Sequence, residues 1–330
     1  MEQTSSKRLI WIDYMKVIGM YLIVAGHFFS IGNKYIYTFS VALFFCISGF
    51  LCKKEEDHRF FWKKLWYNLI IPMILICTIS FAWKTQSEIR HNIFNCENLY
   101  MFPILLISGF HKVLGPMWFV YTLCILKIVF QFLPSKWLYT LAFFSPFITI
   151  ATNECIYNTF EPTTSMGEYA NAITNTTIAF PFFMLGNYNK KWKKQLNECT
   201  LSYRSCFFAI ISLSILYGCG TYNDIVFMYL NGFGSNYILF FLGSITGTIF
   251  IYILSKWLSQ LKSKHIYTLS TGSIAILGFH MIPITYIRSI FVISSWKDYI
   301  IAMTIMLLFI PIINFIEKYI PILIGKYRIR

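Results

Sequence analysis

Charged side chains are scarce in this chain of 330 residues. They make up 13% of it, whereas a soluble globular domain carries about 25%. Hydrophobic residues make up 57% and aromatic residues 19%, and apolar runs near the ~20 residues that span a bilayer recur from end to end. The composition therefore excludes a large soluble domain and predicts a polytopic membrane protein.

Acidic residues are scarcer than basic ones, with 14 Asp and Glu against 28 Lys and Arg and a net charge of +14. Such an excess can indicate a nucleic-acid-binding protein. Here the basic residues gather in alternate loops between the apolar runs, which is the positive-inside pattern of integral membrane proteins. We therefore expect membrane lipid, and no nucleic acid, among the partners.

Paired cysteines, a cleavage site and internal repeats are also lacking. The nine cysteines form no CxxC pair and lie mostly in apolar runs, where a thiol is an ordinary small hydrophobe. A disulfide between Cys96 and Cys155, both in predicted outer loops, is left open. Because no small-residue cleavage site follows the first apolar run, we expect that run to be retained. The absence of a repeat speaks against an inverted-repeat transporter.

Ten apolar segments predict an all-α polytopic membrane bundle of about ten transmembrane helices. They lie at roughly 9–29, 36–52, 66–83, 114–133, 137–152, 171–188, 204–221, 236–255, 269–291 and 299–317. An even number places both termini on one side. With cytoplasmic termini, twenty of the 28 Lys and Arg fall in inner segments, six in outer loops or outer helix ends and two within spans. This distribution favours a cytoplasmic location for both termini.

The first predicted helix carries three ionisable residues at membrane depth: Asp13, Lys16 and His27. Lys16 and His27 are eleven residues apart, which is about three turns and about 16 Å along a helix, so they share nearly one face. Asp13 and Lys16 are an i,i+3 pair that can share charge. Because ionisable groups are costly in a membrane, this polar stripe is expected to face a cavity. The alternative is an interfacial pair at the inner end and a His27 that bonds a neighbouring backbone group.

Three residues mark the outer half of the predicted bundle. His280 lies near the middle of the ninth span. A histidine there more often forms a hydrogen bond between helices than takes part in catalysis, and both roles stay open. Trp118 and Arg288 lie near the outer ends of their spans. Each is expected either to contact an acceptor or to anchor the membrane interface.

The inner entrance to the third span is basic and aromatic, with Arg59, Lys63 and Lys64 close together. Cationic side chains of this kind bind phosphates. They also serve as anchors on anionic lipid, so both roles stay open.

The order of these motifs resembles the membrane acyltransferase 3 family. The matching segments are Asp13-x-x-Lys16 followed by Gly26-His27, FFCISGFL at 44–51, FFWKK at 60–64 with Pro72 after it, MWFV at 117–120, FFMLGN at 182–187, and 269–280 ending in His280. They extend over nearly the whole chain. Each motif alone is short, and their order together with ten spans makes the resemblance specific.

The resemblance implies an integral membrane O-acyltransferase that moves an acyl group, commonly acetyl, from cytoplasmic acetyl-CoA to an acceptor hydroxyl. In bacteria the acceptor is often a cell-surface glycan or its lipid-linked precursor, which implies the inner membrane as the location. We expect one transmembrane acyltransferase domain over 1–330, without an appended soluble domain. The expected co-substrate is acetyl-CoA or another acyl-CoA such as succinyl-CoA, and no metal is expected.

The resemblance also implies residue roles. His27 matches the histidine taken to be catalytic, as a general base or as a transient nucleophile, with Asp13 and Lys16 as its supporting stripe. The expected phosphate-binding residues are Arg8, Arg59, Lys63 and Lys64, and those expected on the acceptor side are Trp118, His280 and Arg288. The chain departs from many members at Trp66, Asn68 and Leu69, where they carry an arginine pair.

Two other functions fit the same composition. A transporter or flippase for a glycan or a lipid-linked sugar also needs intramembrane charges and a cavity, but it needs no acyl-CoA. A scaffold in an envelope-synthesis complex would tolerate changes at His27 and Lys16. Binding of acetyl-CoA separates the enzyme from the transporter.

Overall fold

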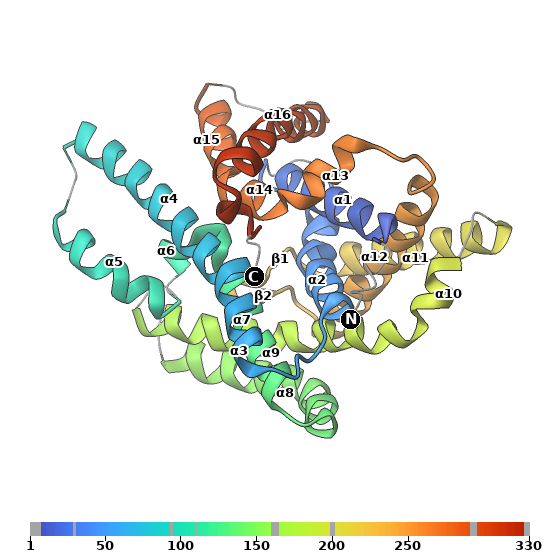
Figure 1. Cartoon of the computed structure of the whole chain (residues 1–330). Helices are drawn as coiled ribbons and strands as arrows, with labels where there is room; N and C mark the ends of the chain where they lie inside the picture. The colour runs from blue at the N-terminus through green and yellow to red at the C-terminus, as the bar shows by residue number, and fades with distance from the viewer. Residues whose placement is uncertain are drawn as a thin grey trace.

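The computed structural model describes residues 8–28, 31–92, 95–109, 111–159, 165–198, 202–290 and 296–326, which form a helical bundle (Figure 1). Its longer helices are α1 (Ile10–Gly26), α2 (Asn33–Leu51), α3 (His58–Leu65), α4 (Ile71–Arg90), α5 (Glu97–Ile107), α7 (Trp118–Phe132), α8 (Ser135–Thr159), α9 (Ser165–Asn189), α11 (Tyr203–Tyr222), α12 (Tyr237–Leu258), α13 (Lys264–Thr271), α15 (Met281–Ile290) and α16 (Lys297–Tyr319). The shorter ones are η1 (Trp66–Ile70), α6 (His111–Leu114), η2 (Gly115–Met117), η3 (Lys190–Trp192), α10 (Lys193–Glu198), η4 (Met228–Leu230), α14 (Ser273–Phe279) and η5 (Pro321–Ile324). Strands β1 (Val226–Phe227) and β2 (Gly232–Phe233) form a small antiparallel hairpin.

The predicted spans all coincide with helices. Within the described ranges, seven helical stretches are long and apolar enough to cross a membrane: Asn33–Leu51, His58–Arg90, Gly115–Phe132, Tyr203–Tyr222, Tyr237–Leu258, Ser273–Ile290 and Lys297–Tyr319. The other predicted spans correspond to α1, which has 17 residues, and to α8 and α9, which carry several Ser, Thr and Asn residues. The prediction of an all-α membrane protein is confirmed. The number ten and the cytoplasmic location of the termini stay predictions.

Large apolar side chains cover the outside of the bundle. Phe207 and Phe208 on α11, and Leu307, Leu308 and Phe315 on α16, are each more than half exposed. Soluble monomers rarely expose contiguous apolar surface of this kind. Lipid is the solvent that accommodates it, so this surface supports a multi-pass membrane protein.

Helices α2 and α9 cross in direct backbone contact. A Cβ atom at Gly49 would lie 1.8 Å from the carbonyl oxygen of Phe183, and one at Gly186 would lie 1.9 Å from that of Cys46. Small residues at a crossing allow such an approach between transmembrane helices. This contact fixes α2, which forms one wall of the site described below.

The predicted span 269–291 is broken into α13, α14 and α15. Gly272 separates the first two helices, at a point where a Cβ would lie 2.4 Å from the side chain of Ile313. Pro283 follows the second break, and because proline has no N–H, the carbonyl of Phe279 loses its helical donor. His280 therefore lies at the junction of α14 and α15 rather than inside a regular helix.

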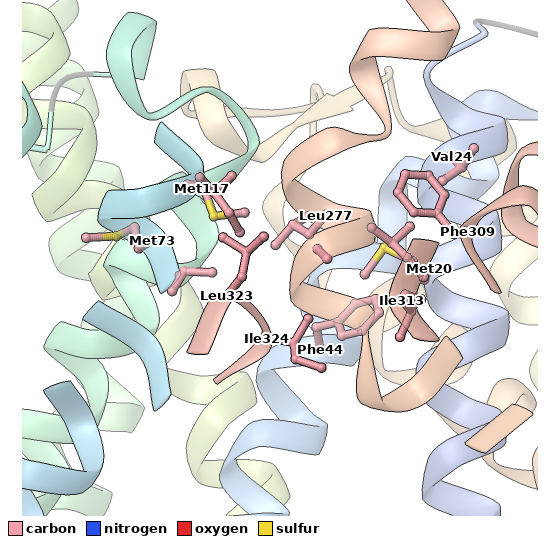
Figure 2. Close-up of a cluster of buried hydrophobic side chains, with 14 of the residues drawn as sticks. Met20, Val24, Phe44, Met73, Met117, Leu277, Phe309, Ile313, Leu323 and Ile324 are labelled. Atoms are coloured by element: carbon pink, nitrogen blue, oxygen red, sulfur yellow. The ribbon is translucent and has the colours of Figure 1, made fainter. Parts of the chain in front are cut away.

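A cluster of buried apolar side chains holds α14 between α1, α4 and α16 (Figure 2). Met20 and Val24 come from α1, Met73 from α4, Leu277 from α14 and Phe309 from α16. Interlocked apolar side chains of this kind pack at close to crystal density. The cluster therefore sets the position of α14 relative to α1, and with it the position of His280 relative to His27.

Candidate functional site

His27 lies at the C-terminal end of α1 and caps it, with φ −68° and ψ −8°. The carbonyl of the preceding Gly26 accepts a 2.7 Å hydrogen bond from Asn33 Nδ2. The carbonyl of His27 accepts one of 3.5 Å from Nη1 of Arg288, on α15. Contacts from α2 and α15 thus hold the backbone that carries the imidazole.

His280 lies beside the His27 ring. The ring centroids of His27 and His280 are 4.9 Å apart and the rings are tilted by 44°. His280 is fully buried, and its Nδ1 lies 3.0 Å from the carbonyl oxygen of Ile276 and 2.8 Å from that of Leu277. Carbonyl oxygens only accept, so Nδ1 carries the proton and Nε2 is an acceptor. Two histidines that are far apart in the sequence thus form one pair.

A cavity of about 520 Å³ contains both imidazoles. Lys16, on the first helix, and Lys127, on α7, line its other end. Neither lysine makes a hydrogen bond or ion pair with another described residue, and no Asp or Glu lines the cavity within the described ranges. All its ionisable side chains other than tyrosines are basic, which suits an anionic or electron-rich ligand.

A second cavity, of about 550 Å³, adjoins the first, since Lys16, Leu51 and Leu69 line both. Its further polar lining includes Arg8, Asp13, Asn68, Lys193, Ser270, Thr271 and Lys326. We call it the inner cavity and the first one the histidine cavity. The guanidinium of Arg8 lies 4.1 Å, and Nζ of Lys326 5.6 Å, from the ring centroid of Tyr267. The inner cavity is therefore built by both ends of the described chain.

Asp13 does not pair with Lys16 as the i,i+3 spacing suggests. Its carboxylate accepts two hydrogen bonds from Arg8, of 2.7 and 2.8 Å, and a third of 2.6 Å from Ser270 Oγ. The hydrogen bond to Asp13 raises the pKa of the Arg8 guanidinium. Arg8 reaches back over the helix start and occupies the carboxylate, while Lys16 lines both cavities.

Replacing Asp13 with asparagine should lower the free energy of unfolding by about 1–3 kcal/mol, because the half-exposed Arg8 guanidinium loses its charged partner and one of the two accepting oxygens becomes an NH2 donor. Thermal unfolding in detergent measures this loss. Glu317→Gln is the matched control, since it removes a more exposed partner of a lysine, Lys326, 2.5 Å away. Surface pairs contribute about 0–1 kcal/mol. An equal loss in both variants would contradict a structural role for Asp13.

Arg59, Lys63 and Lys64 line neither cavity within the described part of the chain. They belong to α3, which begins after Asp57, whose carboxylate accepts from the backbone N–H of Arg59 at 2.8 Å. Lys64 forms an ion pair of 2.7 Å with Glu55. Burial alone would raise the pKa of Glu55, but the hydrogen bond and charge of Lys64, together with Lys53, lower it. Their role in phosphate binding stays a prediction.

Aromatic side chains line the histidine cavity beyond the imidazole pair. The ring of Tyr37 lies 6.3 Å from that of His27 and 5.6 Å from that of Phe227 in the β1–β2 hairpin. Trp118, the first residue of α7, and Tyr229 also line the cavity, as does Arg288. The three residues predicted on the acceptor side, Trp118, His280 and Arg288, are thus brought together.

Sequence reasoning missed Lys193, Lys326, Tyr37 and Tyr229. The two lysines lie in basic inner segments, where most lysines anchor the protein at the membrane surface. Their position in the sequence therefore does not distinguish them from anchoring residues. The tyrosines come from an outer helix end and a short hairpin, and nothing in their spacing marks them. Cys96 and Cys155 are not joined by a disulfide.

Comparison with known proteins gives one match. A family model described as an acyltransferase domain, of the acyltransferase 3 type, matches residues 9–315. No curated protein and no solved structure matches the chain. The match extends from the first helix, with Asp13, Lys16 and His27, through α15 and into α16. It includes the residues that line the histidine cavity and those that line the inner cavity except Arg8, Ile324 and Lys326. The chain therefore belongs to the acyltransferase 3 family of integral membrane O-acyltransferases.

Proposed function

We propose that this protein transfers an acetyl group from cytoplasmic acetyl-CoA to a hydroxyl of a cell-surface glycan or of its lipid-linked precursor. The observation that carries the proposal is the pair of adjoining cavities. One end holds two imidazoles, and the other holds Lys16 and Lys127 and continues into a cationic inner cavity. A thioester with a phosphorylated carrier has this distribution of reactive group and charge.

The inner cavity suits the phosphates of the donor. Arg8, Lys16, Lys193 and Lys326 line it, and cations on phosphates make strong charge-assisted hydrogen bonds. The eleven residues from Lys16 to His27 correspond to about 16 Å along a helix, a length that an extended pantetheine arm covers. The donor would therefore place its thioester beside His27 while its phosphates stay in the inner cavity.

His27 acts as the general base in this proposal. It takes the proton of the acceptor hydroxyl while the hydroxyl oxygen forms a bond to the thioester carbonyl carbon. The carbon–sulfur bond then breaks, and the coenzyme A thiolate takes the proton from His27. General-base catalysis contributes about 10²–10⁴-fold in rate.

Binding of acetyl-CoA to the purified protein tests the donor site. We expect saturable binding, weakened about tenfold or more when Lys193 and Lys326 are both replaced by alanine, because tenfold corresponds to ~1.4 kcal/mol and two charged contacts are lost. The control replaces Arg59 and Lys63, which line neither cavity, and should leave the Kd unchanged. If the Arg59 and Lys63 replacements weaken binding and the Lys193 and Lys326 replacements do not, the phosphates bind at α3 instead. Absence of saturable binding to the wild-type protein would favour the transporter.

The acceptor end suits a sugar. It is lined by aromatic residues whose rings have apolar faces and, in Trp and Tyr, a polar edge: Trp118, Tyr37, Phe227 and Tyr229. Sugar rings present both C–H groups and hydroxyls.

We propose that the protein lies in a bacterial inner membrane with this end outward. Deletion of its gene should remove one acetyl mass per modified residue from the surface polysaccharide. Loss of a succinyl mass would show that the transferred group is succinyl rather than acetyl. An unchanged polysaccharide would exclude this acceptor class.

A further inference from the structure

We propose that His280 is a positioning residue that accepts the N–H of His27 through Nε2 and so fixes the tautomer of the catalytic imidazole. This inference rests on the proposed function, because it concerns the same site. It assigns His280 a role in the proton transfer, whereas the motif order only placed it on the acceptor side.

The backbone hydrogen bonds of His280 occupy its Nδ1 and leave Nε2 for this role. Nδ1 donates to the carbonyl oxygens of Ile276 and Leu277, on the preceding turn, so the lone pair is on Nε2. The side chain is fully buried, and Nε2 has no hydrogen-bond partner among the described residues. An unpartnered buried acceptor costs about 1–3 kcal/mol. Its presence beside a cavity indicates a donor that arrives during function.

His27 is the donor in reach. Its ring centroid is 4.9 Å from that of His280, and its main chain is held by Asn33, through Gly26, and by Arg288. No carboxylate lines the histidine cavity within the described ranges. Other histidine-dependent enzymes use an aspartate to orient the base. Here a second imidazole, neutral and locked by its own backbone tether, takes that place.

The proton balance follows. When the acceptor binds, a rotation of the His27 side chain brings one ring N–H onto Nε2 of His280, and its other ring nitrogen faces the acceptor hydroxyl. When that nitrogen takes the hydroxyl proton, His27 becomes an imidazolium, and His280 stabilises it through the same hydrogen bond. The imidazolium returns its proton to the coenzyme A thiolate, so His280 neither gains nor loses a proton.

Residues other than His280 also pack α14 against its neighbours. A Cβ at Gly278 would lie 2.3 Å from the Ile76 side chain, so α14 packs closely on α4 at that turn. Leu277 lies in the apolar core (Figure 2). A purely structural His280 would need only Nδ1, the nitrogen that bonds the helix carbonyls. The two nitrogens can therefore be tested separately.

The test compares His280→Asn with His280→Gln. The asparagine amide places a donor near the position of Nδ1 but nothing at Nε2, whereas glutamine places its amide near Nε2. We expect His280→Asn to lower kcat by about 10²–10⁴-fold, as loss of an orienting group does. The KM for acetyl-CoA should stay unchanged, and His280→Gln should recover most of kcat. A structural role predicts the opposite order, with the asparagine variant active, and that order would overturn the inference.

His27→Ala in the same assay separates the inference from the function. If this variant is inactive while His280→Asn is normal, the positioning role fails and the function stands. If His27→Ala is fully active, His27 is not the general base, and the positioning role of His280 is excluded with it. Nitrogen-15 spectra of histidine-labelled wild-type protein provide a measurement that needs no folded His280 variant. We expect Nδ1 of His280 protonated and its Nε2 resonance shifted by His27→Ala; protonation at Nε2 would overturn the proposal.

Discussion

His27→Ala is expected to lower the rate of acyl transfer by about 10²–10⁴-fold, the contribution of a general base, without unfolding the protein. The side chain lies after the last turn of α1, and Asn33 and Arg288 donate to the backbone carbonyls of Gly26 and His27. Alanine keeps those carbonyls. The binding of acetyl-CoA should stay near the wild-type value, because the proposed phosphate site begins at Lys16, about 16 Å away along the helix.

The control for this variant is His265→Ala. His265 is exposed near the start of α13 and lines neither cavity. The two variants are compared in vesicles by transfer of radiolabelled acetyl to the acceptor, with equal amounts of inserted protein. Wild-type transfer by His27→Ala would remove the catalytic assignment.

Gly186→Leu is expected to abolish accumulation of folded protein. A Cβ alone would lie 1.9 Å from the carbonyl oxygen of Cys46, so α9 would have to separate from α2. Overpacking of side chains costs about 1–3 kcal/mol, and backbone atoms cannot rotate away as side chains do. We therefore expect a loss larger than that range, measured as the yield of monodisperse protein in detergent and as the thermal unfolding temperature.

Gly218→Leu provides the matched control, since no atom lies within 4 Å of a Cβ at that position on α11. Leucine has a better helix propensity than glycine, by up to about 1 kcal/mol, so this variant should fold normally. Similar yields for both variants would mean that α2 and α9 do not cross in direct backbone contact.

The helices could be predicted from the sequence because hydropathy is a local property. Every predicted span coincides with a helix, but the break at His280 was missed, although Pro283 was a visible sign of it. The spacing of Asp13 and Lys16 predicted that they share charge, but it did not reveal that the hydrogen bonds of Asp13 go to Arg8, which lies before the helix. Local periodicity describes one helix and says nothing of residues outside it.

The site was predictable in its members and not in its geometry. Both histidines were visible as ionisable groups in apolar runs, yet their 4.9 Å approach depends on the packing of α1 against α14 through Met20, Val24 and Leu277. Lys193 and Lys326 become parts of one cavity only when the chain ends meet. These contacts are non-local, and one sequence contains no signal for them.

The meeting of Arg8 and Lys326 around Tyr267 has a consequence for biosynthesis. Residues 321–326 leave the ribosome after helices α1 to α16, so the wall of the inner cavity that Lys326 forms is made later than these helices. A nascent chain with its histidine pair already in the membrane still lacks part of the wall of the inner cavity. Under the proposed function, a chain that stops before residue 321 is therefore expected to bind acyl-CoA more weakly than a chain that contains Lys326.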